Sequence, residues 1–154
     1  KPSKKEIKNI LLWRPSDISE IEGVTLKGGN WIILIKASTN VLKGDNFVFV
    51  YPELLQNKII VRKGEVITSE IIADNELDYK NINLKIRTLL RQTSDNIKSR
   101  GSIVNEITTR GDFIKKIVDS LENNQNIKYK LEVVSLKDSK TVDPVIVDLN
   151  VTKK

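Results

Sequence analysis

The side chains of this chain that could perform acid–base or nucleophilic chemistry are carboxylates, lysines and serines, because histidine and cysteine are both absent. A Ser-His-Asp triad and a thiol nucleophile are therefore impossible, and the usual imidazole and thiolate ligands of zinc are missing. A serine–lysine pair is still allowed, since lysine is abundant, but no local motif indicates one. The inventory predicts a protein that is not an enzyme and has no catalytic residue.

The acidic residues form two short clusters. Asp17, Glu20 and Glu22 are close in sequence, and we expect them to be solvated surface groups. Residues 74–78, Asp-Asn-Glu-Leu-Asp, are rich in oxygen ligands like half of a calcium loop, but they lack its glycine and its terminal glutamate. We expect a polar loop there, and neither a metal site nor another cofactor. Carboxylates distant in sequence can still meet in a fold as the acid–base pair of a glycosidase, so this alternative stays open.

Two other motifs could bind ligands. Gly28-Gly29 is not followed by the Lys-Ser/Thr and helix start of a phosphate-binding loop, so we expect a hairpin turn. Trp31 and the aromatic residues of the segment 47–51 could stack on bases or sugars. Both faces of that segment are apolar, which favours a core strand over a binding surface. Trp13 precedes Arg14-Pro15, where packing by a first strand is favoured over a partner contact. The ligand-binding residues stay unassigned.

The net charge of +6 raises the question of nucleic-acid binding. Six of the 26 basic residues lie at the two ends of the chain, namely Lys1, Lys4, Lys5, Lys8, Lys153 and Lys154. The remaining 20 balance the 20 acidic residues, so the body is neutral. We interpret residues 1–8 as a basic linker and expect no specific nucleic-acid partner. The chain contains no methionine and is expected to be a piece of a longer protein.

Hydrophobic periodicity predicts a mostly β chain. Apolar and polar residues alternate over three segments, which predicts half-buried strands at 81–87, 127–133 and 145–151. The apolar segments 31–35 and 47–51 are expected to pair, with Pro52 ending the second. Shorter strands are expected at 10–13, 24–26, 58–62, 65–73 and 102–107. Lys63-Gly64 predicts a hairpin between two of these, and turns every ten residues or so are typical of a sandwich or barrel.

One segment has helical spacing. Phe113, Ile114, Ile117, Val118 and Leu121 predict a short amphipathic helix near residues 112–122, with Asp112 as N-cap and Asn123 as the stop. Residues 91–100 are polar and are expected to form a loop, with a helical turn as the alternative. No apolar run approaches the ~20 residues needed to cross a membrane, so no membrane insertion is expected. Residues 9–152 are predicted to form a single domain in which strand exceeds helix by at least about threefold, well outside the average mix.

The pattern Lys-Gly-Asp-x-Phe-x-Phe-x-x-Pro, preceded by a strand that begins at Trp31, resembles the Ig-like ligand-binding domains of cell-wall-anchored surface adhesins of Gram-positive bacteria. The matching residues are Gly44, Asp45, Phe47, Phe49 and Pro52. Residues 64–67 resemble the following hairpin, so that the resemblance lies mainly in residues 30–67. Yeast agglutinins show a related pattern, but their cysteines are absent here. The acidic, aromatic motif of many bacterial members is not evident in residues 79–91.

The resemblance implies an Ig-like β-sandwich with a helical insertion near 112–122. It also implies a non-enzymatic binding or spacer module of a larger adhesin-like protein, extracellular and at the cell surface. Its partners would be a protein or peptide ligand and neighbouring domains of the same chain, with a groove between two domains as the binding site. The alternative is a structural or assembly component of a phage tail or secretion apparatus that works through subunit contacts.

Overall fold

The chain is mostly β, as the sequence predicts, but it contains more helix than expected. Among the described residues, 42% lie in strands and 30% in helices, and no sheet is closed. The expected threefold excess of strand is therefore wrong. The computed structural model describes residues 9–12, 14, 16–40, 46–73, 79–104, 106–120 and 127–154. The predicted 1–8 linker, Trp13, the Gly44-Asp45 turn, the 74–78 loop, Leu121 and Asn123 lie outside these ranges.

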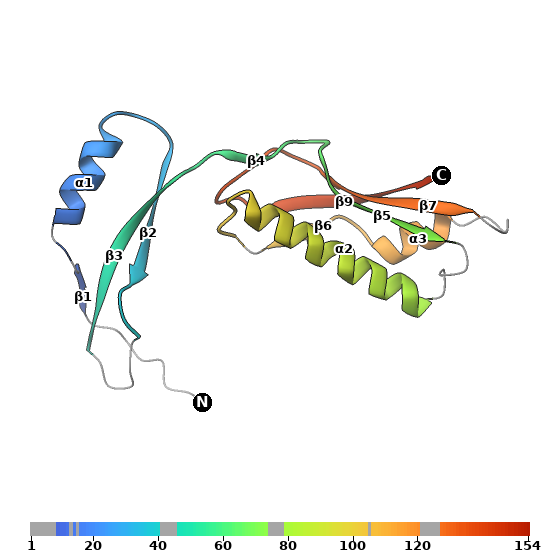
Figure 1. Ribbon diagram of the computed structural model, residues 1–154, viewed down its shortest axis with the longest axis horizontal. Helices are drawn as coiled ribbons and strands as arrows, with labels where there is room; N and C mark the ends of the chain where they lie inside the picture. Colours follow the sequence, from blue (N-terminus) through green and yellow to red (C-terminus); the bar gives the residue numbers. More distant parts are fainter. Residues whose placement is uncertain are drawn as a thin grey trace. The chain divides into compact units, whose positions relative to one another are not determined.

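The chain forms two compact units within the segment that is predicted as a single domain (Figure 1). Unit 1 comprises residues 1–57 and unit 2 comprises residues 58–154. The boundary therefore lies between Asn57 and Lys58. Each unit has its own sheets, so each is described by itself.

Unit 1 contains a three-stranded sheet and one helix. The elements are β1 (Asn9–Leu12), α1 (Ser16–Thr25), β2 (Trp31–Ala37) and β3 (Phe47–Gln56). The strand order is β1-β3-β2, with β1 parallel and β2 antiparallel to β3. The predicted pairing of the two apolar segments is confirmed, in a register that runs from Trp31 opposite Gln56 to Ala37 opposite Val50.

Two sequence expectations for unit 1 are wrong. Pro52 does not end β3 but lies inside it, opposite Ile35. Among the described residues the β1 pairing ends at Val50, so β3 is paired on one side only at Pro52, and proline is tolerated at such an edge. The expected strand at 24–26 is instead the end of α1 and the turn that follows it.

Unit 2 is built on a four-stranded sheet. Its elements are β4 (Ile59–Val61), β5 (Val66–Ala73), α2 (Tyr79–Ser99), β6 (Ile107–Thr109), α3 (Phe113–Ser120), β7 (Lys128–Ser135), β8 (Ser139–Lys140) and β9 (Val145–Lys153). The sheet has the order β5-β7-β9-β6, while β4 and β8 form a separate two-stranded ribbon. Only the β6–β9 pair is parallel in this sheet. The predicted strands at 127–133 and 145–151 correspond to β7 and β9 and are confirmed.

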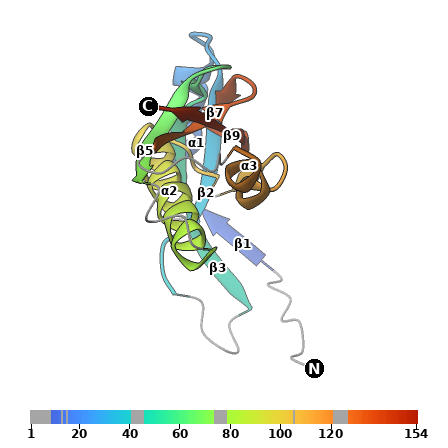
Figure 2. The same cartoon turned by 90° about the vertical axis from the view of Figure 1, so that its right-hand side faces the viewer.

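The hydrophobic core of the described residues lies in unit 2. Alternate residues of the central strands are fully buried, such as Leu131 and Val133 in β7 and Val147 in β9. Helices α2 and α3 lie on one side of this sheet, with α2 by β5 and α3 by β9 (Figure 2). Their apolar stripes, which include Leu89 and Ile117, complete the core. A sheet covered on one side explains the regular alternation of β7 and β9.

Helix α2 corrects two expectations. The alternation at 81–87 predicts a strand, and residues 91–100 are expected to form a loop, but both segments lie mainly in one helix of 21 residues. The buried residues of this helix are separated by three or four positions, namely Ile82, Ile86, Leu89, Thr93 and Ile97. That spacing marks one face of a helix. Leu84, which completes the apparent alternation, is 62% exposed.

The helix predicted near 112–122 is confirmed as α3. The carboxylate of Asp112 accepts hydrogen bonds from the backbone N–H groups of Ile114 (2.9 Å) and Lys115 (3.2 Å), so Asp112 is the predicted N-cap. Phe113 and Ile117 are buried as the spacing indicates. The strand expected at 102–107 is limited to β6, which begins only at Ile107.

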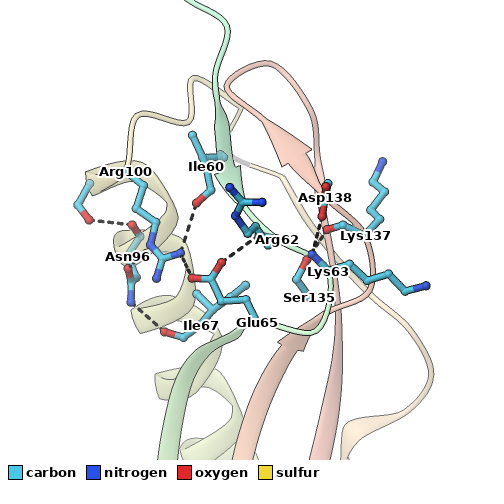
Figure 3. Close-up of polar contacts among 11 residues, drawn as sticks. Ile60, Arg62, Lys63, Glu65, Ile67, Asn96, Arg100, Ser135, Lys137 and Asp138 are labelled. Atoms are coloured by element: carbon cyan, nitrogen blue, oxygen red, sulfur yellow. Dashed lines mark hydrogen bonds and ion pairs between the residues drawn. The ribbon is translucent and has the colours of Figure 1, made fainter.

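A polar network fixes the turn between β4 and β5 (Figure 3). The N–H of Glu65 donates to the carbonyl oxygen of Arg62 (3.1 Å), and Gly64 has a φ of 79°. This confirms the predicted turn, in which glycine supplies the left-handed conformation. The predicted hairpin is wrong, because β4 pairs with β8 and β5 pairs with β7. The N–H of Gly64 instead donates to the carbonyl oxygen of Ser135, the last residue of β7, and the N–H of Lys63 donates to the carboxylate of Asp138.

Candidate functional site

The acidic residues near the start of α1 do not all behave as the sequence predicts. Glu20 and Glu22 are exposed, as expected for a solvated helix face. Asp17 is only 4% exposed, so the expectation of a surface position is wrong for this residue. The helix carries three acidic residues and no basic one, in a protein whose net charge is +6. Asp17 in the first turn also interacts favourably with the positive end of the helix dipole.

Helix α1 ends in a turn that positions β2. The N–H of Gly28 donates to the carbonyl oxygen of Thr25 (3.0 Å), and both Gly28 (φ 83°) and Gly29 (φ 114°) have positive φ. The indole Nε1–H of Trp31, the first residue of β2, donates to the carbonyl oxygen of Gly28 (2.9 Å). Gly28-Gly29 therefore forms a helix-to-strand connection rather than the hairpin turn expected from the sequence. The connection returns the chain to the sheet.

A pocket of about 190 Å³ lies between α1 and β3. Its charged lining residues are Arg14, Asp17 and Glu20, which together carry one net negative charge. Its apolar lining residues are Ile21, Val24, Pro52 and Leu54. Pockets for drug-sized ligands are usually about 300–1,000 Å³, so this one has the size for a smaller group such as one side chain.

The carboxylate of Asp17 is only partly neutralised. Nη2 of Arg14 lies 2.9 Å from Oδ1 of Asp17, at ion-pair distance. Neither oxygen of Asp17 accepts a hydrogen bond from any residue that the structure describes. The Arg14 side chain is itself 63% exposed. A buried carboxylate normally has several hydrogen-bond partners, and this one lacks them.

The sheet beside the pocket has an apolar edge. Strand β2 is paired on one side only in the sheet of the described residues. Ile33 and Ile35 lie opposite Leu54 and Pro52, so the side chains of these pairs share the α1 face of the sheet. Ile33 is 48% and Ile35 57% exposed. We call the pocket together with Ile33 and Ile35 the α1-face site.

The opposite face of this sheet carries the aromatic residues of β3. Phe47 and Phe49 contact edge to face, with ring centroids 5.5 Å apart. Phe47 is 49% and Tyr51 38% exposed, and Phe49 is half-buried. The expected core position of these residues is therefore wrong. The buried residues of this strand are Val48 and Val50, which point to the α1 face.

Neither a metal centre nor a spanning helix is seen in the part of the chain that the structure describes. Its His, Cys, Asp and Glu residues form no group of three or more that could hold a metal ion. Its helices are too short or too polar to cross a membrane. No family model, curated protein or solved structure matches this chain. The candidate site therefore depends on the geometry of unit 1 alone.

Proposed function

We propose that this chain is a non-enzymatic binding module of a larger surface-exposed protein, and that unit 1 contacts the partner. The partner is a peptide segment of another protein that carries apolar and basic residues. The residue pattern at 30–67, with its resemblance to Ig-like adhesin domains, supports the extracellular setting and a sandwich-like architecture. The α1-face site supports the contact itself.

The exposed edge of β2 is the observation that carries the proposal. An edge strand has a row of backbone groups that can pair with another chain, and exposed apolar edges are normally blunted by charge, proline or a covering element. Lys36 is the only charged residue among the seven residues of β2, and its side chain is on the opposite face from Ile33 and Ile35. An extended peptide added to this edge would cover both isoleucines.

Charge complementarity indicates the chemistry of the partner. All charged residues of helix α1 are acidic, although the protein is basic overall. Opposite charges across an interface favour correct encounter and discriminate against other partners. A peptide with basic residues beside apolar ones therefore fits the α1-face site better than an acidic one.

Selection from a library of random peptides tests the proposal. The bait is the full chain, and binding of the enriched peptides is compared with a variant that carries Ile33→Lys and Ile35→Lys. The matched control is Ile71→Lys, since Ile71 is 42% exposed on β5, the edge strand of the unit 2 sheet. We expect enriched peptides that are apolar and basic, and that bind the wild type and the control but not the double variant. Peptides that bind all three proteins equally would contradict the proposal.

The same edge also favours one second candidate, a subunit contact between copies of this chain. If two β2 strands pair antiparallel with Leu34 opposite Leu34, Ile33 of one copy lies opposite Ile35 of the other, on the same face. Analytical ultracentrifugation distinguishes this candidate. Self-association that the Ile33→Lys, Ile35→Lys variant loses would favour it over peptide binding.

A further inference from the structure

The lining of the pocket between α1 and β3 carries two carboxylates and one cation, so negative charge is in excess. Asp17 is only 4% exposed, yet the one cation close to it among the described residues is Arg14, whose own side chain is 63% exposed. Oδ2 of Asp17 has no hydrogen-bond partner among the described residues. Glu20 adds a second carboxylate to the same lining. A buried carboxylate with free acceptor positions gains most from a further charged donor, because hydrogen bonds to charged groups are about twice as strong as neutral ones.

The remaining walls of the pocket are apolar. Ile21 and Val24 of α1 face Pro52 and Leu54 of β3 around a volume of about 190 Å³. Apolar walls with a carboxylate at one end suit a ligand that has a hydrocarbon stem and a cationic end. Lysine and arginine side chains have this construction, and they bury their stems along apolar surfaces while the charge remains hydrogen-bonded.

We propose that this pocket binds one lysine or arginine side chain of the partner peptide. The methylene stem packs against Ile21, Val24 and Leu54, and the cationic end donates hydrogen bonds to Asp17. The source of the side chain rests on the proposed function, but the chemistry of the pocket does not. Arg14 lies at ion-pair distance from Oδ1 of Asp17 in the free protein, so it competes with the ligand for the charge of this carboxylate.

Small probes test the pocket without any partner protein. N-acetyl-lysine methylamide and N-acetyl-arginine methylamide are titrated into the full chain labelled with ¹⁵N, and N-acetyl-norleucine methylamide serves as the uncharged control. We expect saturable shifts of the backbone amide resonances of Ile21, Val24 and Leu54 with both cationic probes. The norleucine probe should bind at least about tenfold more weakly, because it lacks the charge-assisted hydrogen bond. The two cationic probes also show whether lysine or arginine is preferred.

Three variants separate a binding role of Asp17 from a structural one. Asp17→Asn should weaken the binding of the cationic probes about tenfold. Arg14→Ala should bind them more tightly than the wild type, since the intramolecular competitor is gone. Glu22→Gln, an exposed residue of the same helix outside the pocket lining, should leave binding unchanged.

Arg14→Ala keeps the inference testable if Asp17→Asn unfolds unit 1. A structural Asp17 predicts no gain of binding when the exposed Arg14 is removed. Unchanged or weaker binding by Arg14→Ala, or equal shifts with the norleucine probe, would overturn the inference. If the probes fail while library peptides still require Ile33 and Ile35, the pocket assignment is wrong and the proposed function stands. If the probes bind but no peptide is enriched, the pocket assignment stands and the proposed function is wrong.

Discussion

Arg100 and Glu65, which are 35 residues apart in the chain, form an ion pair that joins the end of α2 to the turn before β5. The same carboxylate accepts a hydrogen bond from the N–H of Arg62 (2.9 Å), and the guanidinium donates to the carbonyl oxygen of Ile60 (3.3 Å). The backbone hydrogen bond from Arg62, followed by the hydrogen bond from Arg100, lowers the pKa of Glu65 below its ordinary value. This carboxylate therefore couples the stability of unit 2 to pH.

The pH dependence of the variant Glu65→Gln follows from this shift. Because the pKa of Glu65 is lowered in the folded protein, its stabilisation is present above the unfolded value near 4.5 and is lost as pH falls through the folded pKa. We expect Glu65→Gln to lower the free energy of unfolding at about pH 7 and to have much less effect at about pH 3. Urea denaturation of both proteins at the two pH values measures this.

The pH dependence of the wild type must be compared with that of Glu65→Gln, because folding also lowers the pKa of a second carboxylate. Burial alone would raise the pKa of Asp148, but hydrogen bonds from Lys116 and from the N–H of Leu149 outweigh it, and the net shift is downward. The wild type therefore loses stability in acid for both reasons. An equal effect of Glu65→Gln at the two pH values would show that the Glu65 interactions do not depend on its charge.

Core and surface substitutions in the unit 2 sheet should differ sharply in how much they lower the free energy of unfolding. Leu131 of β7 is fully buried, whereas Ile71 of the neighbouring strand β5 is 42% exposed. Leu131→Ala should cost about 2–5 kcal/mol of unfolding free energy through lost burial and cavity formation. Ile71→Ala should change it by about 0.5 kcal/mol or less. Chemical denaturation measures both, and similar costs would mean that the buried face of the sheet is misassigned.

The parts of the fold that the sequence predicts well are those where one local pattern matches one environment. Strands β7 and β9 alternate strictly because helices cover one side of their sheet and the other side is more open. Asp112 and the apolar spacing after it likewise predict α3, since capping and periodicity are both local signals.

The errors occur where a local pattern is ambiguous or where a tertiary contact decides. Ile82, Leu84 and Ile86 alternate, but Ile82 and Ile86 also lie one helical turn apart, and the spacing to Leu89 was the signal that distinguishes a helix. Ser16-Asp17 before a segment with Ile18, Ile21 and Val24 at helical spacing, which ends at Gly28-Gly29, was a similar signal for α1. The burial of Asp17 could not be predicted, because it depends on β3 packing against α1 from a distant part of the sequence.

Unit 2 should fold without unit 1. The core cluster of buried residues extends from Ile60 to Leu149 and lies wholly in unit 2. In the described part of unit 1, the buried apolar residues are Val48 and Val50. We expect a fragment of residues 58–154 to unfold cooperatively on heating, as small domains with a contiguous core do. A fragment of residues 1–57 should unfold over a broad range, since so small a core gives little stability.

Circular dichroism of the two fragments and of the full chain measures this difference. The fragment 58–154 should keep the midpoint of the main transition of the full chain within a few degrees, as a loss of about 1 kcal/mol would shift it by about 4–8 °C. A fragment 58–154 that is unfolded at room temperature would show that unit 1 contributes to its core.

Replacing either of two glycines of unit 1 with alanine should change the stability of the unit, in opposite directions for the two positions. Gly29 has a φ of 114°, and an added Cβ would lie 2.7 Å from Nε1 of Trp31, the group that donates to the carbonyl oxygen of Gly28. Gly29→Ala should therefore destabilise unit 1 by about 1–3 kcal/mol through backbone strain, with a further cost if the Trp31 hydrogen bond is lost.

Gly23 lies within α1, and an added Cβ there meets nothing within 4 Å. Gly23→Ala should stabilise the helix by about 0.5–1 kcal/mol. Hydrogen exchange of the β2 and β3 amides reports on unit 1 specifically, and it should become faster in Gly29→Ala and slower in Gly23→Ala. Slower exchange in both variants would mean that the Gly28-Gly29 connection is not under the constraint that its φ values indicate.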